Sequence, residues 1–298
     1  MDSLLAWGVE VVVALQTASP WLDWPALAIT LLGSELALML AATIVYWRVD
    51  RRLGFRLAVL LVGSALVNVA LKAIFAAPRP FGFDPRVALI GPRPTSGGLP
   101  SGHAQLTMTL AGALGWVARR RRVWVTALSL VALVSLSRLY LGVHFPHDLV
   151  AGLLLGALAA AIFVVVENAR ERRFGGEHEL SDRALVVLGL ALGLPLLASG
   201  HPFAVGSMGL LGGVLVGDRL VRRGRSPGVG RPRWLALGAG GLGALHVGAA
   251  RTTKALALVI GSPADLPLRF VRYGMSGLWI AWFWPALHER IVRSAPPR

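Results

Sequence analysis

The sequence predicts an all-α membrane protein, a polytopic helical bundle with a six-helix core followed by three or four further transmembrane helices. Three observations lead to this fold class. Hydrophobic residues make up 55% of the 298 residues and charged residues only 15%, a composition typical of polytopic membrane proteins and rare in soluble domains. Long apolar stretches recur along the chain, and the stretches between them are rich in arginine. Cysteine is absent, which excludes disulfides and thiolate metal sites.

The first half of the chain supplies the six helices of the core. Residues 4–18 are apolar but short, because crossing a bilayer takes about 20 residues. We therefore expect a tilted or interfacial first helix there. The other five spans are predicted at residues 25–47, 53–75, 103–118, 123–141 and 146–166. Residues 76–100 contain six prolines and predict an irregular loop rather than a helix.

The second half predicts a separate set of helices. We divide the chain into a six-helix membrane core at 1–167, a polar cytoplasmic connector at 168–183, and additional transmembrane helices of unknown role at 184–298. The further apolar stretches lie at residues 184–198, 203–221, 234–250 and about 268–287.

The distribution of basic residues predicts the orientation. If the spans alternate across the bilayer, 21 of the 30 Lys and Arg residues fall on one side. The positive-inside rule places that side in the cytoplasm. The net charge of +15 is thus expected to set orientation and to attract anionic lipids, not to bind nucleic acid. We predict a multi-pass protein of the cell membrane whose polar islands face the periplasm or exterior.

Three cations are predicted to gather on that outer face. Lys72 ends one span, Arg79 follows between two prolines, and Arg138 ends another span. Charge this close to a bilayer is costly unless it has a function. Arginine's planar fork suits phosphate oxygens and lysine adds a point charge, so the three predict a phosphate-binding site. Interfacial snorkelling is the alternative for each cation taken alone.

A second polar island, Pro100-Ser101-Gly102-His103, begins the span at 103–118. Amides in the first turn of a helix are a ready anion site, and Gly102 permits close approach of backbone to a ligand. Ser101 can donate its hydroxyl, and His103 can give a proton to a leaving oxygen. A plain helix cap is the alternative for Ser101 alone.

The third island holds His144 and Asp148, four residues apart. On one helical face the carboxylate can accept from one imidazole nitrogen and leave the other facing an electrophile. We expect His147 to have a surface role. Two weaker expectations concern Asn68, one turn before Lys72 and able to position it, and Glu35, mid-span and more suited to an interhelical hydrogen bond than to catalysis.

A metal site is not predicted, and neither is a cofactor. Two histidines and an aspartate could hold zinc. However, Lys72, Arg79 and Arg138 would have to converge on the same place, and three cations repel a divalent ion. In this prediction the cations neutralise the phosphoryl charge that magnesium neutralises in kinases.

These residues resemble the three-part signature of the type 2 phosphatidic acid phosphatase (PAP2) superfamily. Its first motif, lysine, six residues and Arg-Pro, is similar to Lys72 through Arg79-Pro80. Its second, Pro-Ser-Gly-His, is similar to residues 100–103. Its third, Ser-Arg, five residues, His, three residues and Asp, is similar to Ser137-Arg138, His144 and Asp148. The resemblance covers residues 1 to about 167 and implies a six-helix core with phosphohistidine chemistry.

The resemblance also implies a role for each residue. His144 attacks phosphorus, Asp148 orients it, and His103 protonates the leaving group and then activates water. The residues that hold the phosphoryl oxygens are Lys72, Arg79, Ser101, Gly102 and Arg138.

The function predicted is a metal-independent lipid phosphate phosphatase of the membrane. Candidate substrates are phosphatidic acid, phosphatidylglycerol phosphate, a prenyl diphosphate and a sphingoid base phosphate, and membrane lipids are the expected partners. Two alternatives stay open: a phosphotransferase that passes the phosphoryl group to an acceptor other than water, and a lipid-binding or transport protein without chemistry. Gly206, Gly209, Gly213 and Gly217 predict close helix packing within the bundle or in a homodimer.

Overall fold

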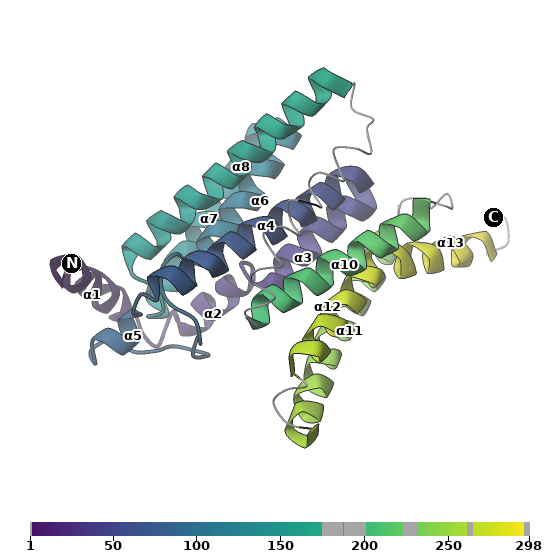
Figure 1. Ribbon diagram of the computed structural model, residues 1–298. Helices are drawn as coiled ribbons and strands as arrows, with labels where there is room; N and C mark the ends of the chain where they lie inside the picture. Colours follow the sequence, from purple (N-terminus) through teal and green to yellow (C-terminus); the bar gives the residue numbers. More distant parts are fainter. Residues whose placement is uncertain (1, 175–186, 188–200, 223–231, 261–264, 295–298) are drawn as a thin grey trace. The chain divides into compact units, whose positions relative to one another are not determined.

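The computed structural model (Figure 1) describes residues 2–174, 187, 201–222, 232–260 and 265–294. Within these ranges the secondary structure is helical and contains no strand, so the all-α class is confirmed. The chain separates into two compact units, residues 1–38 with 67–181, and residues 39–66 with 182–298. The predicted boundary followed the linear sequence, whereas residues 39–66 group with the C-terminal helices.

The first unit is built on three long helices. Helix α6 (Gly102–Ala118) packs against both α7 (Arg121–Tyr140) and α8 (Pro146–Phe174), and the three run side by side in Figure 1. Glycines bring α8 close to α6: a Cβ at Gly152 would lie 2.5 Å from the Ser101 carbonyl oxygen, and one at Gly156 would lie 2.3 Å from that of Gln105. Small residues permit this approach, which places the start of α6 beside the start of α8.

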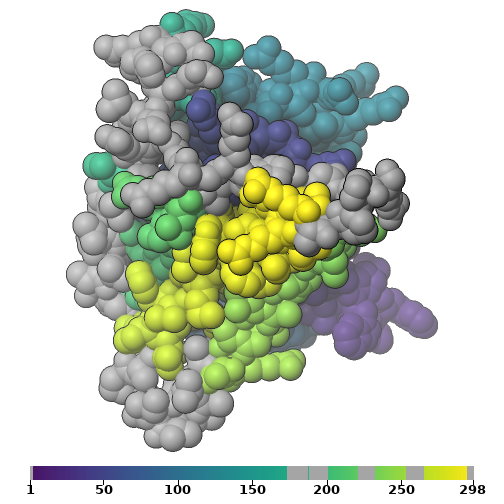
Figure 2. Space-filling view, turned by 90° about the vertical axis from the view of Figure 1, so that its right-hand side faces the viewer, coloured from purple at the N-terminus to yellow at the C-terminus, as the bar shows by residue number. Residues whose placement is uncertain are grey.

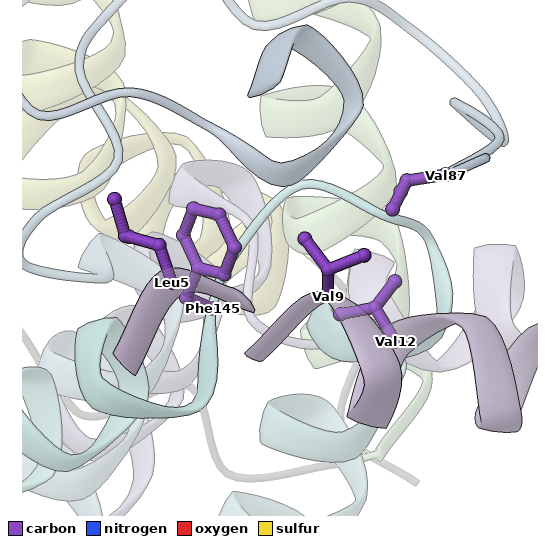
Figure 3. Packing of buried hydrophobic residues seen from close by; sticks show 5 residues of the cluster. All are labelled: Leu5, Val9, Val12, Val87 and Phe145. Atoms are coloured by element: carbon purple, nitrogen blue, oxygen red, sulfur yellow. The ribbon is translucent and has the colours of Figure 1, made fainter. Parts of the chain in front are cut away.

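Helix α1 (Asp2–Gln16) is 15 residues long, short for a span as the sequence predicted. It contributes Leu5, Val9 and Val12 to a buried cluster with Val87 and Phe145 (Figure 3). Phe145 lies between His144 and Pro146 at the start of α8. The first helix therefore packs against the loop that carries His144.

The span predicted at residues 25–47 is not one straight helix. Helix α2 (Asp23–Leu31) and α3 (Glu35–Ile44), which continues into the π-helical turn η1 (Val45–Val49), are bent by 46° at a short break. Gly33 lies in the break, and a Cβ there would come within 2.7 Å of Val134 and 2.9 Å of His103. Glycine disfavours a continuous helix, and its missing side chain allows this close approach to α6 and α7.

Among the described residues, four helices are long and apolar enough to cross a membrane, and the bent pair makes up to five. The four are Arg51–Phe83, Arg121–Tyr140, Pro146–Arg172 and Pro202–Leu220. The first comprises α4 (Arg51–Phe75) and the short α5 (Pro80–Phe83). Helix α6 has 17 residues, or about 25 Å at 1.5 Å per residue, so it is slightly shorter than the others. The helix predicted at 184–198 lies outside the described residues.

The second unit contains α10 (Pro202–Arg222), α11 (Pro232–Ile260), α12 (Asp265–Leu278), the π-helical turn η3 (Trp279–Phe283) and α13 (Trp284–Ser294). Their atoms, green to yellow in Figure 2, lie in contact with one another. The glycines of α10 face α12 and η3: a Cβ at Gly209 would lie 2.3 Å from the Phe270 carbonyl oxygen, and one at Gly213 would lie 2.1 Å from that of Gly274. The predicted close packing is thus made within the chain.

Residues 45–51 join this second unit through polar contacts. The carboxylate of Asp218 accepts from Arg51 Nε at 2.9 Å and from the Tyr46 hydroxyl at 3.1 Å. Trp47 Nε1 donates to the Ile280 carbonyl at 2.7 Å. These bonds explain why residues near the start of α4 group with helices far along the sequence.

Candidate active site

Two cations of the first motif reach one short backbone segment. Lys72, in the last turn of α4, donates from Nζ to the carbonyls of Gly97 and Gly98 at 2.6 and 3.1 Å. Arg79 has extended backbone and precedes α5. Its Nε donates to the Ser96 carbonyl at 2.8 Å and its Nη2 to that of Gly97 at 3.0 Å. The carbonyls of residues 96–98 thereby bring both cations together.

Arg79 also reaches the third motif. Its Nη1 donates to the Val143 carbonyl at 2.6 Å and lies 3.4 Å from Nε2 of His144. A guanidinium only donates hydrogen bonds, so the Nε2 atom that faces it carries a lone pair rather than a hydrogen. The neutral imidazole then has its hydrogen on Nδ1.

Asp148 fixes that tautomer. His144 Nδ1 lies 3.2 Å from Oδ2 of Asp148, and the same oxygen accepts from the Phe145 amide at 2.9 Å. Both side chains are buried, with 2% and 0% of their residue surface exposed. The predicted pairing over four residues is present at the start of α8, and it leaves Nε2 of His144 facing Arg79 rather than the carboxylate.

The surroundings keep His144 uncharged. Burial, reinforced by the positive charges of Arg79, Arg138 and Lys72, holds the pKa of His144 well below its usual value. Desolvation and nearby like charge both penalise the imidazolium. That Lys72, Arg79 and Arg138 all act on this one ring means that the three predicted cations converge. A neutral imidazole among cations is suited to attack an anionic phosphoryl group.

The second motif begins α6 beside this pair. Ser101 is the residue before the helix, and its amide donates to the Asp148 backbone carbonyl at 3.0 Å. Its hydroxyl is fully buried and has no hydrogen-bond partner in the described part of the chain. Buried polar groups are nearly always satisfied, so this hydroxyl and the first-turn amides of α6 fit an anionic ligand.

Arg138 is held from a fourth element. It lies in the last turn of α7, and its Nη1 donates to the Thr30 hydroxyl of α2 at 2.9 Å. Its Nε is buried and has no partner among the described residues. Arg138 therefore has a donor available while Thr30 fixes the orientation of its guanidinium.

His103 lies in the first turn of α6, against the break between α2 and α3. A Cβ on Gly33 would come within 2.9 Å of its ring. Glu35 follows the same break and is exposed in the first turn of α3.

Asn68 contacts the second motif. Its Nδ2 donates to the Gln105 side-chain oxygen at 2.8 Å and to the Pro100 carbonyl at 3.3 Å. A Cβ on Gly102 would lie 3.1 Å from the Asn68 oxygen. The sequence paired Asn68 with Lys72 on spacing along α4, but the amide is directed at the Pro100–Gly102 turn and positions that turn.

His147 is less peripheral than the sequence indicated. Its ring stacks on Phe145 at 5.3 Å between centroids, and its Nε2 lies 3.4 Å from Oδ1 of Asp148. The aspartate thus has a histidine near each oxygen. Thr30, Gln105 and the carbonyls of 96–98 were missed as well, because no spacing in the sequence links them to the motifs.

Metal-ligating side chains do not cluster in the described residues, where no group of three or more His, Asp or Glu residues could hold an ion.

Comparison with known proteins finds a family match. Residues 53–172 match the PAP2 superfamily, and all three motifs lie in this stretch. The chain is 33% identical over 127 residues to undecaprenyl-diphosphatase of Sulfolobus acidocaldarius, which covers 43% of this chain and 61% of that protein. It is 29% identical over 224 residues to human glucose-6-phosphatase 3, which covers 66% of this chain and 62% of that protein.

The chain therefore spans about three fifths of the length of these two relatives. Among solved structures, it is similar to the transmembrane PAP2-type phosphatidylglycerolphosphate phosphatase from Bacillus subtilis. The identity is 25%, the TM-score is 0.48, and the match covers 58% of this chain and 90% of that one.

Proposed function

We propose that this protein is a membrane lipid phosphatase that hydrolyses a phosphomonoester or diphosphate through a phosphohistidine intermediate. The observation that carries the proposal is the buried His144, with Nδ1 on Asp148 and Nε2 turned toward Arg79. A neutral nucleophile bordered by fixed cations matches the charge of a phosphoryl group, for which positioning and electrostatic stabilisation supply most of the catalysis.

In the first step, the lone pair of His144 Nε2 forms a bond to phosphorus as the bond from phosphorus to the leaving oxygen breaks. His103 gives a proton to that oxygen. Arg79, Arg138, Lys72 and the Ser101 hydroxyl stabilise the charge on the phosphoryl oxygens.

In the second step, water attacks phosphorus and gives a proton to His103. The bond to Nε2 breaks, the electron pair returns to the imidazole, and phosphate leaves. Asp148 keeps Nδ1 protonated and stabilises the positive charge that the ring carries in the phosphoenzyme.

A lipid substrate is favoured by the setting. Three of the helices at the motifs, α4, α7 and α8, are long and apolar enough to cross a membrane, and one similar protein is named an undecaprenyl-diphosphatase. Another similar protein is named a glucose-6-phosphatase, so a sugar phosphate is the substrate to compare with lipid phosphates in the assay. The positive-inside rule supports an active site on the extracytoplasmic side.

The test is phosphate release by purified full-length protein in detergent with EDTA present. We expect release from phosphatidic acid or a prenyl diphosphate and little from glucose 6-phosphate. His144→Asn keeps a donor toward Asp148 and removes the nucleophile, so it should lower the rate at least a thousandfold. Asp84→Asn, a loop aspartate paired with Arg86, is the control and should retain activity.

Three results would each contradict a different part of the proposal. Reversible loss of activity in EDTA would overturn the metal-independent mechanism. A phosphorylated acceptor in place of free phosphate would identify a phosphotransferase. Full activity of His144→Asn would overturn the assignment of the nucleophile.

A further inference from the structure

A second cluster of cations lies in the second unit, outside the PAP2 motifs. Arg269 and Arg272 are three residues apart on α12, so their side chains share one face. The guanidinium carbon of Arg269 lies 5.7 Å from the centroid of the Tyr273 ring, and that of Arg272 lies 4.9 Å from it. Tyr273 is buried. Both arginines are therefore held against one fixed aromatic platform.

Helix α11 adds a histidine to this platform. The His246 ring meets Tyr273 edge-on, with 4.8 Å between centroids. Its Nδ1 lies 3.2 Å from the Ser276 hydroxyl, which itself donates to the Arg272 carbonyl at 3.1 Å. Since the Ser276 hydrogen is used in that bond, Nδ1 of His246 is the donor and Nε2 faces away from Ser276.

His201 immediately precedes α10 and lies near enough to Arg269 to feel its charge. Burial and the positive charge of Arg269 lower the pKa of His201. Side chains of α11 and α12 thus gather positive or protonatable groups around Tyr273, and His201 lies near one of them, Arg269.

Counter-charges are missing from this cluster in the described ranges. Asp265 lies one turn before Arg269, yet neither Arg269 nor Arg272 makes an ion pair there. The Nε atoms of both arginines are buried and have no hydrogen-bond partner in those ranges. By contrast, another arginine of this unit, Arg51, is paired with Asp218. Two adjacent guanidiniums with unused donors are costly unless an anion joins them.

We propose that Arg269, Arg272 and His246 form a second phosphate-binding site. The guanidiniums supply paired donors that match phosphate oxygens. The negative charge of a bound phosphate would favour protonation of His246 Nε2, which would then add a third donor. The same chemistry recognises the phosphate of an anionic lipid headgroup or free inorganic phosphate. Arginine stacking on tyrosine alone would explain the ring contacts, but it leaves the two buried Nε donors unused.

The test counts bound phosphate. Full-length protein in maltoside micelles, which contain no phosphate, is dialysed to equilibrium against radiolabelled inorganic phosphate. Arg269→Gln/Arg272→Gln should bind one equivalent fewer than the unsubstituted protein. Arg120→Gln/Arg290→Gln removes the same charge from exposed positions and should lose none. Retention of the helical circular dichroism signal shows that each variant is folded.

A second arm identifies the source of the phosphate. Micelles are supplemented with phosphatidylglycerol or with uncharged diacylglycerol. If a lipid headgroup is the ligand, phosphatidylglycerol lowers the count by one equivalent in the unsubstituted protein and not in Arg269→Gln/Arg272→Gln. If free phosphate is the ligand, the counts do not change.

Equal phosphate counts for the unsubstituted protein and Arg269→Gln/Arg272→Gln would overturn the second site. The comparison is independent of the proposed phosphatase activity, because it measures a difference between two proteins with the same active site. Repeating it with His144→Asn in both backgrounds should give the same difference of one equivalent.

Discussion

At the scale of single residues, the geometry of the site is set by the few hydrogen-bond partners that each buried polar atom has. Oδ2 of Asp148 accepts hydrogen bonds from both His144 Nδ1 and the Phe145 amide. The carboxylate therefore fixes the orientation of the His144 ring and of the loop that carries it. Arg79 faces the other nitrogen of the same ring. Each contact restricts His144 to one tautomer and one orientation before substrate binds, which reduces the reorganisation needed in the reaction.

Asn68 is a positioning residue in this arrangement. We expect Asn68→Ala to lower kcat about tenfold with a smaller change in KM, because the Pro100–Gly102 turn loses the amide that bonds the Pro100 carbonyl and Gln105. The lost buried bonds should also cost about 1–3 kcal/mol of stability. Steady-state kinetics and thermal unfolding measure the two effects.

The matched control is Ser64→Ala, which removes another buried polar group from the same helix. An equal fall in kcat in both variants would show that Asn68 acts through stability alone.

The pH dependence follows from the low pKa of His144. A lowered pKa means that the imidazole is neutral, and able to attack, at every pH above that low value. The midpoint of the acid limb of kcat/KM should therefore lie at a pH below about 6.5, the usual pKa of histidine. The measurement is a pH–rate profile corrected for the second ionisation of the substrate phosphate. A limb centred at or above that value would mean that His144 titrates as an ordinary histidine.

At the scale of elements, short helix α1 supports the catalytic loop. Its apolar face covers Phe145 (Figure 3), and Gln16 at its end binds the backbone of Ala88 and Tyr140 through three hydrogen bonds. A helix too short to cross a bilayer thus fixes the start of α8 and the end of α7.

Gly8 makes this contact possible. A Cβ at Gly8 would lie 2.7 Å from the Phe145 ring, whereas a Cβ at Gly63 of α4 meets nothing within 4 Å. Both substitutions to alanine raise helix propensity by about 1 kcal/mol. We expect Gly8→Ala to lower phosphatase activity severalfold by displacing Phe145 and the adjacent His144, and Gly63→Ala to leave it unchanged. Steady-state kinetics of the two variants, measured side by side, test this expectation. Equal activity would show that α1 does not influence the site.

At the scale of the whole molecule, the absence of cysteine allows the orientation to be tested. Arg86, in the loop between α5 and α6, and Arg121, the first residue of α7, are exposed. They belong to opposite sides in the predicted topology, so each can be replaced by a single cysteine. An impermeant maleimide should label Arg86→Cys in intact cells and Arg121→Cys only after permeabilisation. The reverse pattern would place the active site in the cytoplasm.

Much of the site could be predicted because its residues lie in short local patterns. Spacing alone places His144 and Asp148 on one helical face, and proline before Ser101 marks the start of α6. Apolar stretches long enough to cross a bilayer likewise predict α4, α7, α8 and α10. These features depend on neighbours along the chain, and the amino-acid sequence by itself determined them.

Only the tertiary structure decided how distant residues meet. Thr30 holds Arg138 across 108 positions, and Tyr46 joins Asp218 across 172. The break at Gly33 depends on the packing of α6 and α7 against it, and the contact of Asn68 with the second motif depends on the packing of α4 against the start of α6. Side-chain contacts between helices are set by interhelical distance and rotation, which glycines such as Gly152 control, and no local pattern encodes those two quantities.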